Sequence, residues 1–388
     1  MNPKLRISYH ELSFVSKYYK IQAMRNKLFS FPFLILILFS ACKKNEKNNA
    51  IPTGAIDIDV RVLTRNLSFP WEIIWGPDNM IWMTERGGRV SKVNPANGDV
   101  IPLLTIPDVK SQGEGGLLGM ALHPDFNATP HVFVAYNYDR SGDYREKIVR
   151  YTYTGNTLTN PQTIFDNIDA AGIHNGCRLL IIDQKLYVTT GDAADQSLPQ
   201  KTTSVNGKIL RLNLDGTIPS DNPIPGSPVW TYGHRNAQGL VFANGILYSS
   251  EHGPDTDDEI NVIEKGKNFG WPDVKGFCNT GSEQSFCSAN NVKEPIQAWS
   301  PTIAVCGLDY YNHNLIAGWK NSLLLCTLRG SRLVQLQLND SHTAVTSSSE
   351  YLRDDYGRLR DICISPDGKV YVCTNNGNDS ILCITNYH

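Results

Sequence analysis

The sequence has almost no excess of charge of either sign. Its 388 residues include 36 Lys and Arg against 38 Asp and Glu, which gives a formal net charge of −2 at pH 7. Proteins that bind nucleic acids by neutralising phosphates, or membrane surfaces through polybasic patches, carry an excess of positive charge. We therefore expect no nucleic-acid partner, and membrane contact only through an N-terminal lipid anchor.

Helical periodicity is also nearly absent, and so is a low-complexity composition. The 31 glycines and 21 prolines are close to average usage, which excludes a collagen-like chain. Short runs rich in β-branched and aromatic residues recur instead, each preceded by a turn. They cover residues 76–85, 128–137, 182–192, 243–253, 319–330 and 365–376.

Equivalent apolar residues of these runs lie 47 to 76 positions apart, and they are Trp82, Phe133, Tyr187, Tyr248, Leu324 and Tyr371. A unit of about 50 residues has room for about four strands, so six units predict an all-β, six-bladed β-propeller. The widest gap predicts an insertion at roughly 272–300. A pair of all-β sandwich domains is the alternative, but no linker-like change of composition follows residue 55.

The N-terminus resembles a bacterial lipoprotein signal. A basic stretch begins at Met24, and residues 28–39 form an apolar run of signal-peptide length. Two small residues then precede Cys42, as at the lipidation site of bacterial lipoproteins. We expect an upstream extension and signal peptide over 1–41 and a flexible tether over 42–55. A plain secretory signal or a short anchor helix is the alternative.

This signal places the remaining domain, residues 56–388, outside the cytoplasm. We expect a protein that is lipid-anchored to the bacterial cell envelope and faces the periplasm or the exterior. An oxidising compartment permits disulfides. Cys278 and Cys287 bracket a polar loop and are the best candidate pair. Three further cysteines lie in predicted strands, where we expect them to be buried as small apolar side chains: Cys363, Cys373 and Cys383.

Polar motifs flank the predicted strands. The glycine-rich segment 113–119 lacks the lysine of a phosphate-binding loop, so it predicts a close backbone approach. His174 stands at a strand entrance; a structural role is the simplest explanation, but Asp192 after the next strand is able to orient it as a general base. The acidic segment 251–259 suits Ca²⁺, although an acidic loop alone is usually only solvated.

Two arginines, Arg358 and Arg360, alternate along a predicted strand. Alternate residues of a strand point to the same face. Two guanidinium groups side by side predict an anionic or planar partner.

Taken in order, the motifs resemble one family. They are GEGGLLG (113–119), HNGCRL (174–179), GD (191–192), NGKILRLN (206–213), YGHRNAQGL (232–240), EHGPDTDDEIN (251–261), KNFGWPDV (267–274), SPTIAVCGLDYY (300–311), TLRG (327–330) and GRLRDICISPDG (357–368). This order is similar to that of the soluble quinoprotein glucose dehydrogenases and related aldose sugar dehydrogenases. These are six-bladed propellers that use pyrroloquinoline quinone (PQQ) and Ca²⁺.

The resemblance implies roles for individual residues. His174 matches the general base, Asp192 the acid that holds it, and Arg235 the cation beside the reacting quinone oxygen. The residues that match cofactor contacts are Glu114, Asn236, Arg329, Arg358 and Arg360. Gly253 and Pro254 match ligands of the calcium beside the cofactor, and Glu259 and Phe269 match those of a second, structural calcium.

Some positions depart from the family pattern. Glu114 stands where the glucose dehydrogenases have Gln, and Arg329 where they have Lys, which keeps the charge but changes the geometry. Cys177 and Cys306 replace small residues near the site, as fillers or as an altered pocket wall.

The resemblance implies a PQQ- and calcium-dependent oxidation of the C1 hydroxyl of aldoses to lactones. Hydride passes to PQQ, and the electrons then pass to an acceptor that the sequence does not identify. Two alternatives remain: a binding propeller without catalysis, and a lactonase-type hydrolytic propeller.

Overall fold

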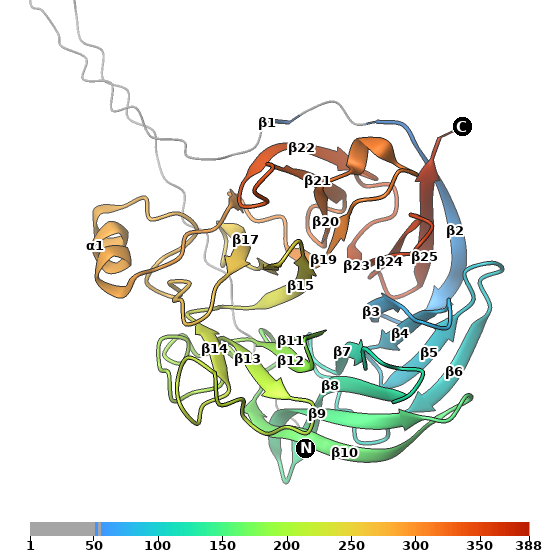
Figure 1. Ribbon diagram of the computed structural model, residues 1–388, viewed down its shortest axis with the longest axis horizontal. Helices are drawn as coiled ribbons and strands as arrows, with labels where there is room; N and C mark the ends of the chain where they lie inside the picture. The colour runs from blue at the N-terminus through green and yellow to red at the C-terminus, as the bar shows by residue number, and fades with distance from the viewer. Residues whose placement is uncertain (1–50, 53–55, 388) are drawn as a thin grey trace, which may run out of the picture. The chain divides into compact units, whose positions relative to one another are not determined.

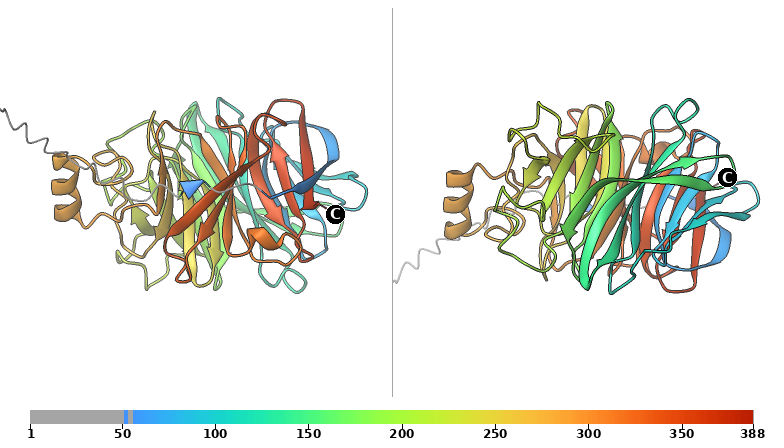
Figure 2. Two further views of the ribbon diagram at one scale, coloured as in Figure 1. Left: turned by 90° about the horizontal axis from the view of Figure 1, so that it is seen from above. Right: turned by 90° about the horizontal axis from the view of Figure 1, so that it is seen from below.

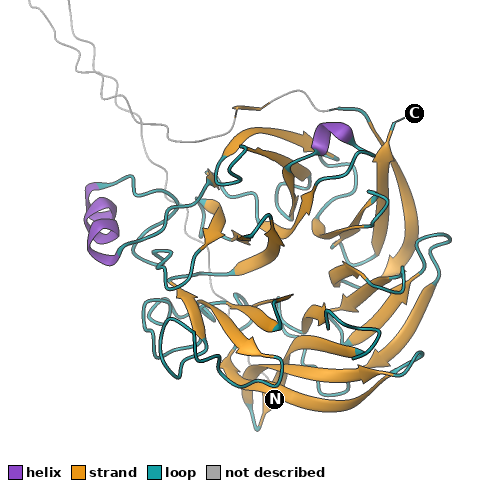
Figure 3. Ribbon diagram, viewed as in Figure 1, coloured by secondary structure: helices purple, strands orange, loops and turns teal. Residues whose placement is uncertain are grey.

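Six β-sheets, arranged in a ring, make up most of the computed structural model, which describes residues 51–52 and 56–387 (Figures 1 and 3). The described residues belong to one unit, Glu46–His388. The predicted six-bladed propeller is therefore confirmed. The predicted signal peptide, Cys42 and nearly all of the tether lie outside the described residues.

The first three sheets follow chain order. Blade one contains β3 (Pro70–Trp75), β4 (Ile81–Glu85), β5 (Arg89–Val93) and β6 (Val100–Thr105). Blade two contains β7 (Leu117–Leu122), β8 (His131–Arg140), β9 (Asp143–Tyr153) and β10 (Leu158–Asp169). Blade three contains β11 (Gly176–Ile182), β12 (Lys185–Thr190), β13 (Lys208–Asn213) and β14 (Val229–Tyr232).

The fourth sheet also follows chain order, and the fifth and sixth each add a strand from the N-terminal part of the described chain. Blade four contains β15 (Ala237–Ala243), β16 (Ile246–Glu251), β17 (Asp258–Ile263) and β18 (Gln297–Trp299). Blade five contains β19 (Val305–Tyr311), β20 (Ser322–Thr327), β21 (Leu333–Leu338) and β22 (Val345–Tyr351), with β1 (Ile51–Pro52) parallel to β22. Blade six contains β23 (Leu359–Ile364), β24 (Val370–Thr374), β25 (Asp379–Asn386) and β2 (Ile58–Leu67), which pairs with β25 and closes the ring.

The sequence repeat marks one position in every blade. Each of the six matched residues, from Trp82 to Tyr371, lies in the second strand of its blade. The first strand of each blade contacts the first strand of the next, so β3, β7, β11, β15, β19 and β23 line the centre of the ring.

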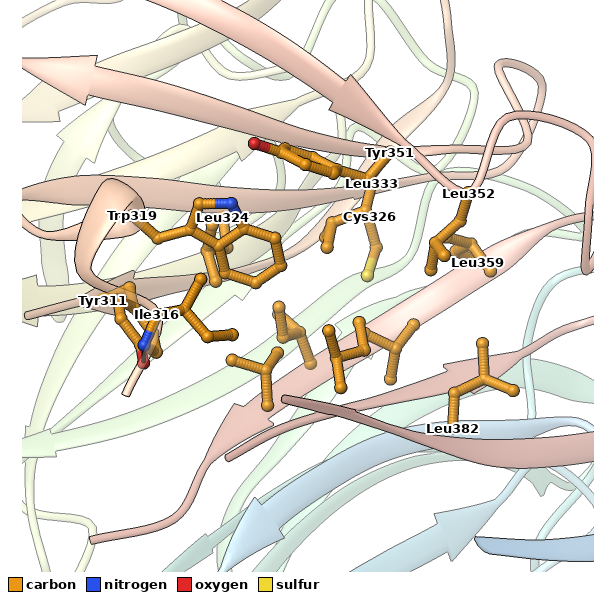
Figure 4. Close-up of a cluster of buried hydrophobic side chains, with 14 of the residues drawn as sticks. Tyr311, Ile316, Trp319, Leu324, Cys326, Leu333, Tyr351, Leu352, Leu359 and Leu382 are labelled. Carbon is orange, nitrogen blue, oxygen red and sulfur yellow. Dashed lines mark hydrogen bonds between the residues drawn. The ribbon is translucent and has the colours of Figure 1, made fainter. Parts of the chain in front are cut away.

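Blades pack face to face, and this explains why their middle strands are apolar on both sides. All residues of β4 and β20 are buried. Between blades five and six, Leu324, Cys326 and Leu333 pack near Leu359 and Leu382 in one cluster (Figure 4). A strand buried on both faces reads as a continuous apolar run rather than as an alternation. Cys363, Cys373 and Cys383 are buried in β23, β24 and β25, as expected.

An insertion between β17 and β18 projects from the rim of the ring (Figure 2). It carries α1 (Gly281–Asn290), which no helical periodicity predicted, and the disulfide between Cys278 and Cys287. None of the residues of α1 is buried, so the helix has no apolar stripe to detect. Its capping box, in which Thr280 and Glu283 bond each other's backbone, is the signal that marks its start. The other helix of the described part is a 3₁₀ turn, η1 (Ala317–Trp319). No helix within residues 56–387 is long and apolar enough to cross a membrane.

Candidate active site

The predicted site residues gather at one end of the ring. Glu114, His174, Arg235, Asn236 and Arg358 directly precede the first strands of their blades, whereas Asp192, Gly253, Pro254 and Arg329 follow second strands. The first two strands of a blade are antiparallel, so the start of one and the end of the other lie at the same edge.

The His174–Asp192 pair is formed as the sequence predicts. His174 Nδ1 lies 2.8 Å from Asp192 Oδ1, and the exposed fractions of the two side chains are 14% and 1%. Asp192 also accepts hydrogen bonds from Ala194 N (2.8 Å) and Trp271 Nε1 (2.9 Å). Because the carboxylate offers only acceptors, we assign the hydrogen to His174 Nδ1. His174 Nε2 is then left with a free lone pair.

The backbone around this pair is tightly constrained. His174 itself has a left-handed conformation, with φ +58°. A Cβ on Gly191 would lie 1.8 Å from the His174 carbonyl oxygen, which explains the Gly-Asp order after β12. Asn236 Oδ1 accepts a hydrogen bond from Gly176 N (3.1 Å), and Glu114 Oε2 accepts one from His174 N (3.3 Å). Left-handed residues other than glycine concentrate at functional sites.

Arg235 is held from three sides. Its backbone N–H donates to Glu251 Oε1, and its Nη1 donates to the His252 carbonyl oxygen (3.2 Å). Its guanidinium lies 5.3 Å from the centre of the Trp271 ring. Burial lowers the pKa of Arg235 from its usual range, and its buried Nε has no hydrogen-bond partner among the described residues.

Arg360 is a buried cation without an acidic partner. It is 6% exposed, and its Nη1 and Nη2 donate to the amide oxygens of Gln238 (2.6 Å) and Asn375 (3.3 Å). Within the described part of the chain no carboxylate forms an ion pair with it, and its Nε is unpaired. Burial lowers its pKa, and the Glu114 carboxylate opposes that effect. A buried guanidinium of this kind has unused capacity for an anion.

The sequence predicts that Arg358 and Arg360 both lie in one strand, and the structure places only Arg360 there. Arg358 precedes β23 and is exposed, whereas Arg360 lies within β23 and is buried. The pairing of β23 with β24 has a register shift between Leu359 and Asp361, so simple alternation does not hold there. Arg329 is also exposed, with its Nη1 3.4 Å from Thr302 Oγ1.

The four predicted calcium ligands line one pocket, together with Arg235 and Trp271: Gly253, Pro254, Glu259 and Phe269. Glu251 and Asp257 line it too. Burial and the charges of Glu251 and Asp257 raise the pKa of Glu259 to about 8. The described residues contain no group of three His, Cys, Asp or Glu side chains with metal-site geometry. Backbone carbonyls, which three of the predicted ligands would use, are not part of such a group.

Sequence reasoning missed three residues of the site. Trp271 reaches Asp192 because the insertion runs beside β14, where Phe269 N donates to Tyr232 O (2.9 Å). Gln238 holds Arg360, and His252 packs near Arg235 and His174. Burial and the charges of Arg360 and Arg235 lower the pKa of His252 to about 3, so its imidazole is neutral. All three belong to motifs that the sequence shows, but a motif does not reveal long-range contacts.

The two cysteines near the site are fillers. Cys177 and Cys306 are fully buried in the apolar clusters of the blades. Cys306 Sγ lies 3.2 Å from the Cys326 carbonyl oxygen and 3.1 Å from the Leu359 carbonyl oxygen, so its single S–H group has an acceptor in either direction. Neither side chain forms an exposed pocket wall.

Residues 67–383 match the family model described as glucose / sorbosone dehydrogenase. The chain belongs to this family. The expected resemblance is therefore confirmed over nearly all of the described residues.

Relatives of the chain align with it over most of its length. Quinoprotein glucose dehydrogenase B of Acinetobacter calcoaceticus is 32% identical, over 83% of this chain and 86% of its own. Aldose sugar dehydrogenase YliI of Escherichia coli is 30% identical, over 86% of this chain and 95% of its own. The PQQ-bound aldose sugar dehydrogenase of Streptomyces coelicolor superposes with a TM-score of 0.73 at 33% identity, over 86% of this chain and 99% of its own.

Proposed function

We propose that the protein is a PQQ-dependent aldose sugar dehydrogenase that oxidises the C1 hydroxyl of sugars to lactones. Its family and its PQQ-bound relative support the reaction class. One observation carries the proposal for this chain: Arg360 is a buried cation whose described partners are neutral amides, at the end of the ring that holds His174 and Asp192. A hydrolytic lactonase has no use for such a cation.

The residues present fit an anionic, acceptor-rich cofactor. Arg235 and Arg360 each have a buried Nε donor without a partner among the described residues. PQQ is a planar tricarboxylate, and charge-assisted bonds to such donors are the strong ones. Arg235 and Arg360 would hold it from within the ring, and Arg358 and Arg329 from the exposed rim. When bound, PQQ supplies the quinone carbonyl that accepts hydride from the sugar C1.

His174 is the proposed general base. With Nδ1 bonded to Asp192, its Nε2 would accept the C1 hydroxyl proton. Asp192 fixes this tautomer and stabilises the imidazolium that forms. Proton removal by a positioned base contributes about 10²–10⁴-fold in rate.

Calcium is the proposed metal of the adjoining pocket. The pocket is lined by three acidic side chains, Glu251, Asp257 and Glu259. Among the described residues no Lys or Arg forms an ion pair with them, and His234 bonds Glu251. Hard oxygen ligands of this kind suit Ca²⁺. Gly253 and Pro254 would add backbone carbonyls for the calcium beside the cofactor, and Phe269 would add one, with Glu259, for the second, structural calcium.

A binding propeller without catalysis is the second candidate, because a buried cation alone serves recognition as well. The retained His174–Asp192 pair favours the enzyme. We also propose that Cys42 anchors the protein to the cell envelope, where an acceptor of unknown identity takes the electrons.

Reconstitution tests the proposal. Purified protein is loaded with PQQ and Ca²⁺, and a panel of aldoses is screened with an artificial dye acceptor. We expect sugar-dependent dye reduction that requires PQQ. A folded protein that binds PQQ but oxidises no aldose would be the binding module.

A further inference from the structure

A buried ion cluster fills the centre of the ring beside Arg360. Arg178 Nη1 lies 2.6 Å from Glu72 Oε1 and 3.0 Å from Asp361 Oδ1. Arg178 is 3% exposed, and both carboxylates are buried as well. The three residues come from the first strands of blades three, one and six, which are the strands that line the centre.

This cluster and Arg360 share two neighbours. Arg178 Nε donates to the Gln238 carbonyl oxygen (2.8 Å), and Arg360 Nη1 donates to the Gln238 side chain (2.6 Å). Their guanidinium carbons lie 4.4 and 5.8 Å from the centre of the Trp71 ring. The two cations therefore lie close together, although only one of them has acidic partners.

Both acidic side chains are partners of Arg178 and neither is a partner of Arg360. Asp361 directly follows Arg360 in the chain, yet its Oδ1 bonds Arg178 and its Oδ2 accepts from Ile73 N (2.7 Å). Glu72 bonds Arg178 through Oε1 and accepts from Met120 N through Oε2 (3.3 Å). Each oxygen of both carboxylates thus already has a partner, and no ion pair joins either carboxylate to Arg360 among the described residues.

We propose that Arg178 is a positioning residue that holds Asp361, the carboxylate next to Arg360 in the chain, away from Arg360 and so keeps the charge of Arg360 available for an anion in the active site. The inference rests on the proposed function, because that anion is PQQ. Without Arg178, a buried carboxylate would turn to the nearest unneutralised cation, since an unpaired buried charge is costly. Arg360 would then be neutralised before the cofactor arrives.

Titration of apo-protein with PQQ, followed by absorbance, tests this. Arg178→Met should weaken PQQ binding by about tenfold to a hundredfold, the range of one charge-assisted contact. The double variant Arg178→Met/Asp361→Asn removes the competing carboxylate as well and should restore affinity to within about threefold of wild type. Arg211→Met is the matched control, because Arg211 is also a largely buried arginine with an acidic partner, Asp221, and lies outside the site. It should bind PQQ as wild type does.

The outcomes separate the two claims. A wild-type protein that does not bind PQQ overturns the proposed function and this inference with it. Wild-type binding together with unchanged affinity in Arg178→Met overturns only the inference. A purely structural role for Arg178 predicts that the double variant binds no better than the single one. If Arg178→Met does not fold, the double variant decides. A folded double variant whose PQQ affinity is about tenfold or more below that of wild type overturns the inference.

Discussion

Asp192→Asn is the sharpest test of the proposed base, because it changes charge and hydrogen-bonding pattern while keeping shape. All three partners of the Asp192 side chain are donors: His174 Nδ1 and Ala194 N at 2.8 Å, and Trp271 Nε1 at 2.9 Å. A carboxylate accepts from all of them. An amide has one oxygen, so its NH₂ group must face at least one N–H group.

The expected losses of activity and stability in this variant follow from that mismatch. Either a buried donor loses its partner, or His174 changes tautomer and its Nε2 becomes protonated before the sugar binds. Loss of a functioning general base lowers kcat by about 10²–10⁴-fold. Leaving one buried donor unpaired costs about 1–3 kcal/mol of stability, which a domain of ordinary stability tolerates. The variant should therefore fold and lose turnover.

The assay is dye-linked sugar oxidation in a double-mutant cycle. His174→Ala, Asp192→Asn and the double variant are compared at saturating PQQ and Ca²⁺, with Asp221→Asn as a control at an exposed aspartate. If Asp192 acts through His174, the second substitution adds little once the first is present. PQQ affinity should stay close to that of wild type in His174→Ala.

Two results would refute this reasoning. Near-wild-type dye reduction by Asp192→Asn or His174→Ala would remove the pair from catalysis. Fully additive losses in the double variant would show that Asp192 acts independently of His174.

Further tests address the cofactor, the metal and stability. Arg360→Met should weaken PQQ binding by about tenfold or more, whereas Arg358→Met, at an exposed position, should cost about fivefold or less; equal losses in absorbance titrations would contradict the burial argument. Chelation should inactivate the holoenzyme and Ca²⁺ with PQQ should restore it; activity in a preparation shown to be metal-free by elemental analysis would rule out the calcium. Burial raises the pKa of Glu146 from 4.5 to about 8, so this group favours the folded state below pH 4.5 and loses that contribution as pH rises through 8. Wild type should therefore lose unfolding free energy between these pH values relative to Glu146→Gln in denaturant titrations, and parallel curves would contradict the assignment.

The sequence predicts the fold well because a propeller is a repeat. Trp82 and its five counterparts recur at the same strand of each blade, so one local pattern read six times fixes the architecture. The insertion is predicted as a gap in that pattern. Its helix is not predicted, because α1 buries no residue and only a local capping box marks it in the sequence.

The sequence predicts some contacts of the site but not others. His174 and Asp192 follow from strand ends that meet at one edge, so alternation of strands brings them together. Arg358 is exposed and precedes β23, whereas Arg360 is buried within it, and the residue types do not reveal where the strand begins. The contact from Trp271 to Asp192 joins residues 79 positions apart through the path of the insertion. Such contacts depend on tertiary packing, and no local pattern encodes them.

The pairing of β2 with β25 means that one blade is built from both ends of the described chain. During synthesis from the N-terminus, β2 must therefore remain without its partner β25 until the end of the chain has been made. Asp379 stabilises this junction through hydrogen bonds. Its Oδ2 accepts one from Phe69 N (3.1 Å), and its Oδ1 accepts one from Thr374 Oγ1 (2.9 Å). Proteolytic removal of residues 58–67 would expose the whole edge of β25. An exposed strand edge of that kind pairs readily with a neighbouring molecule, so the closing strand also protects the protein from self-association.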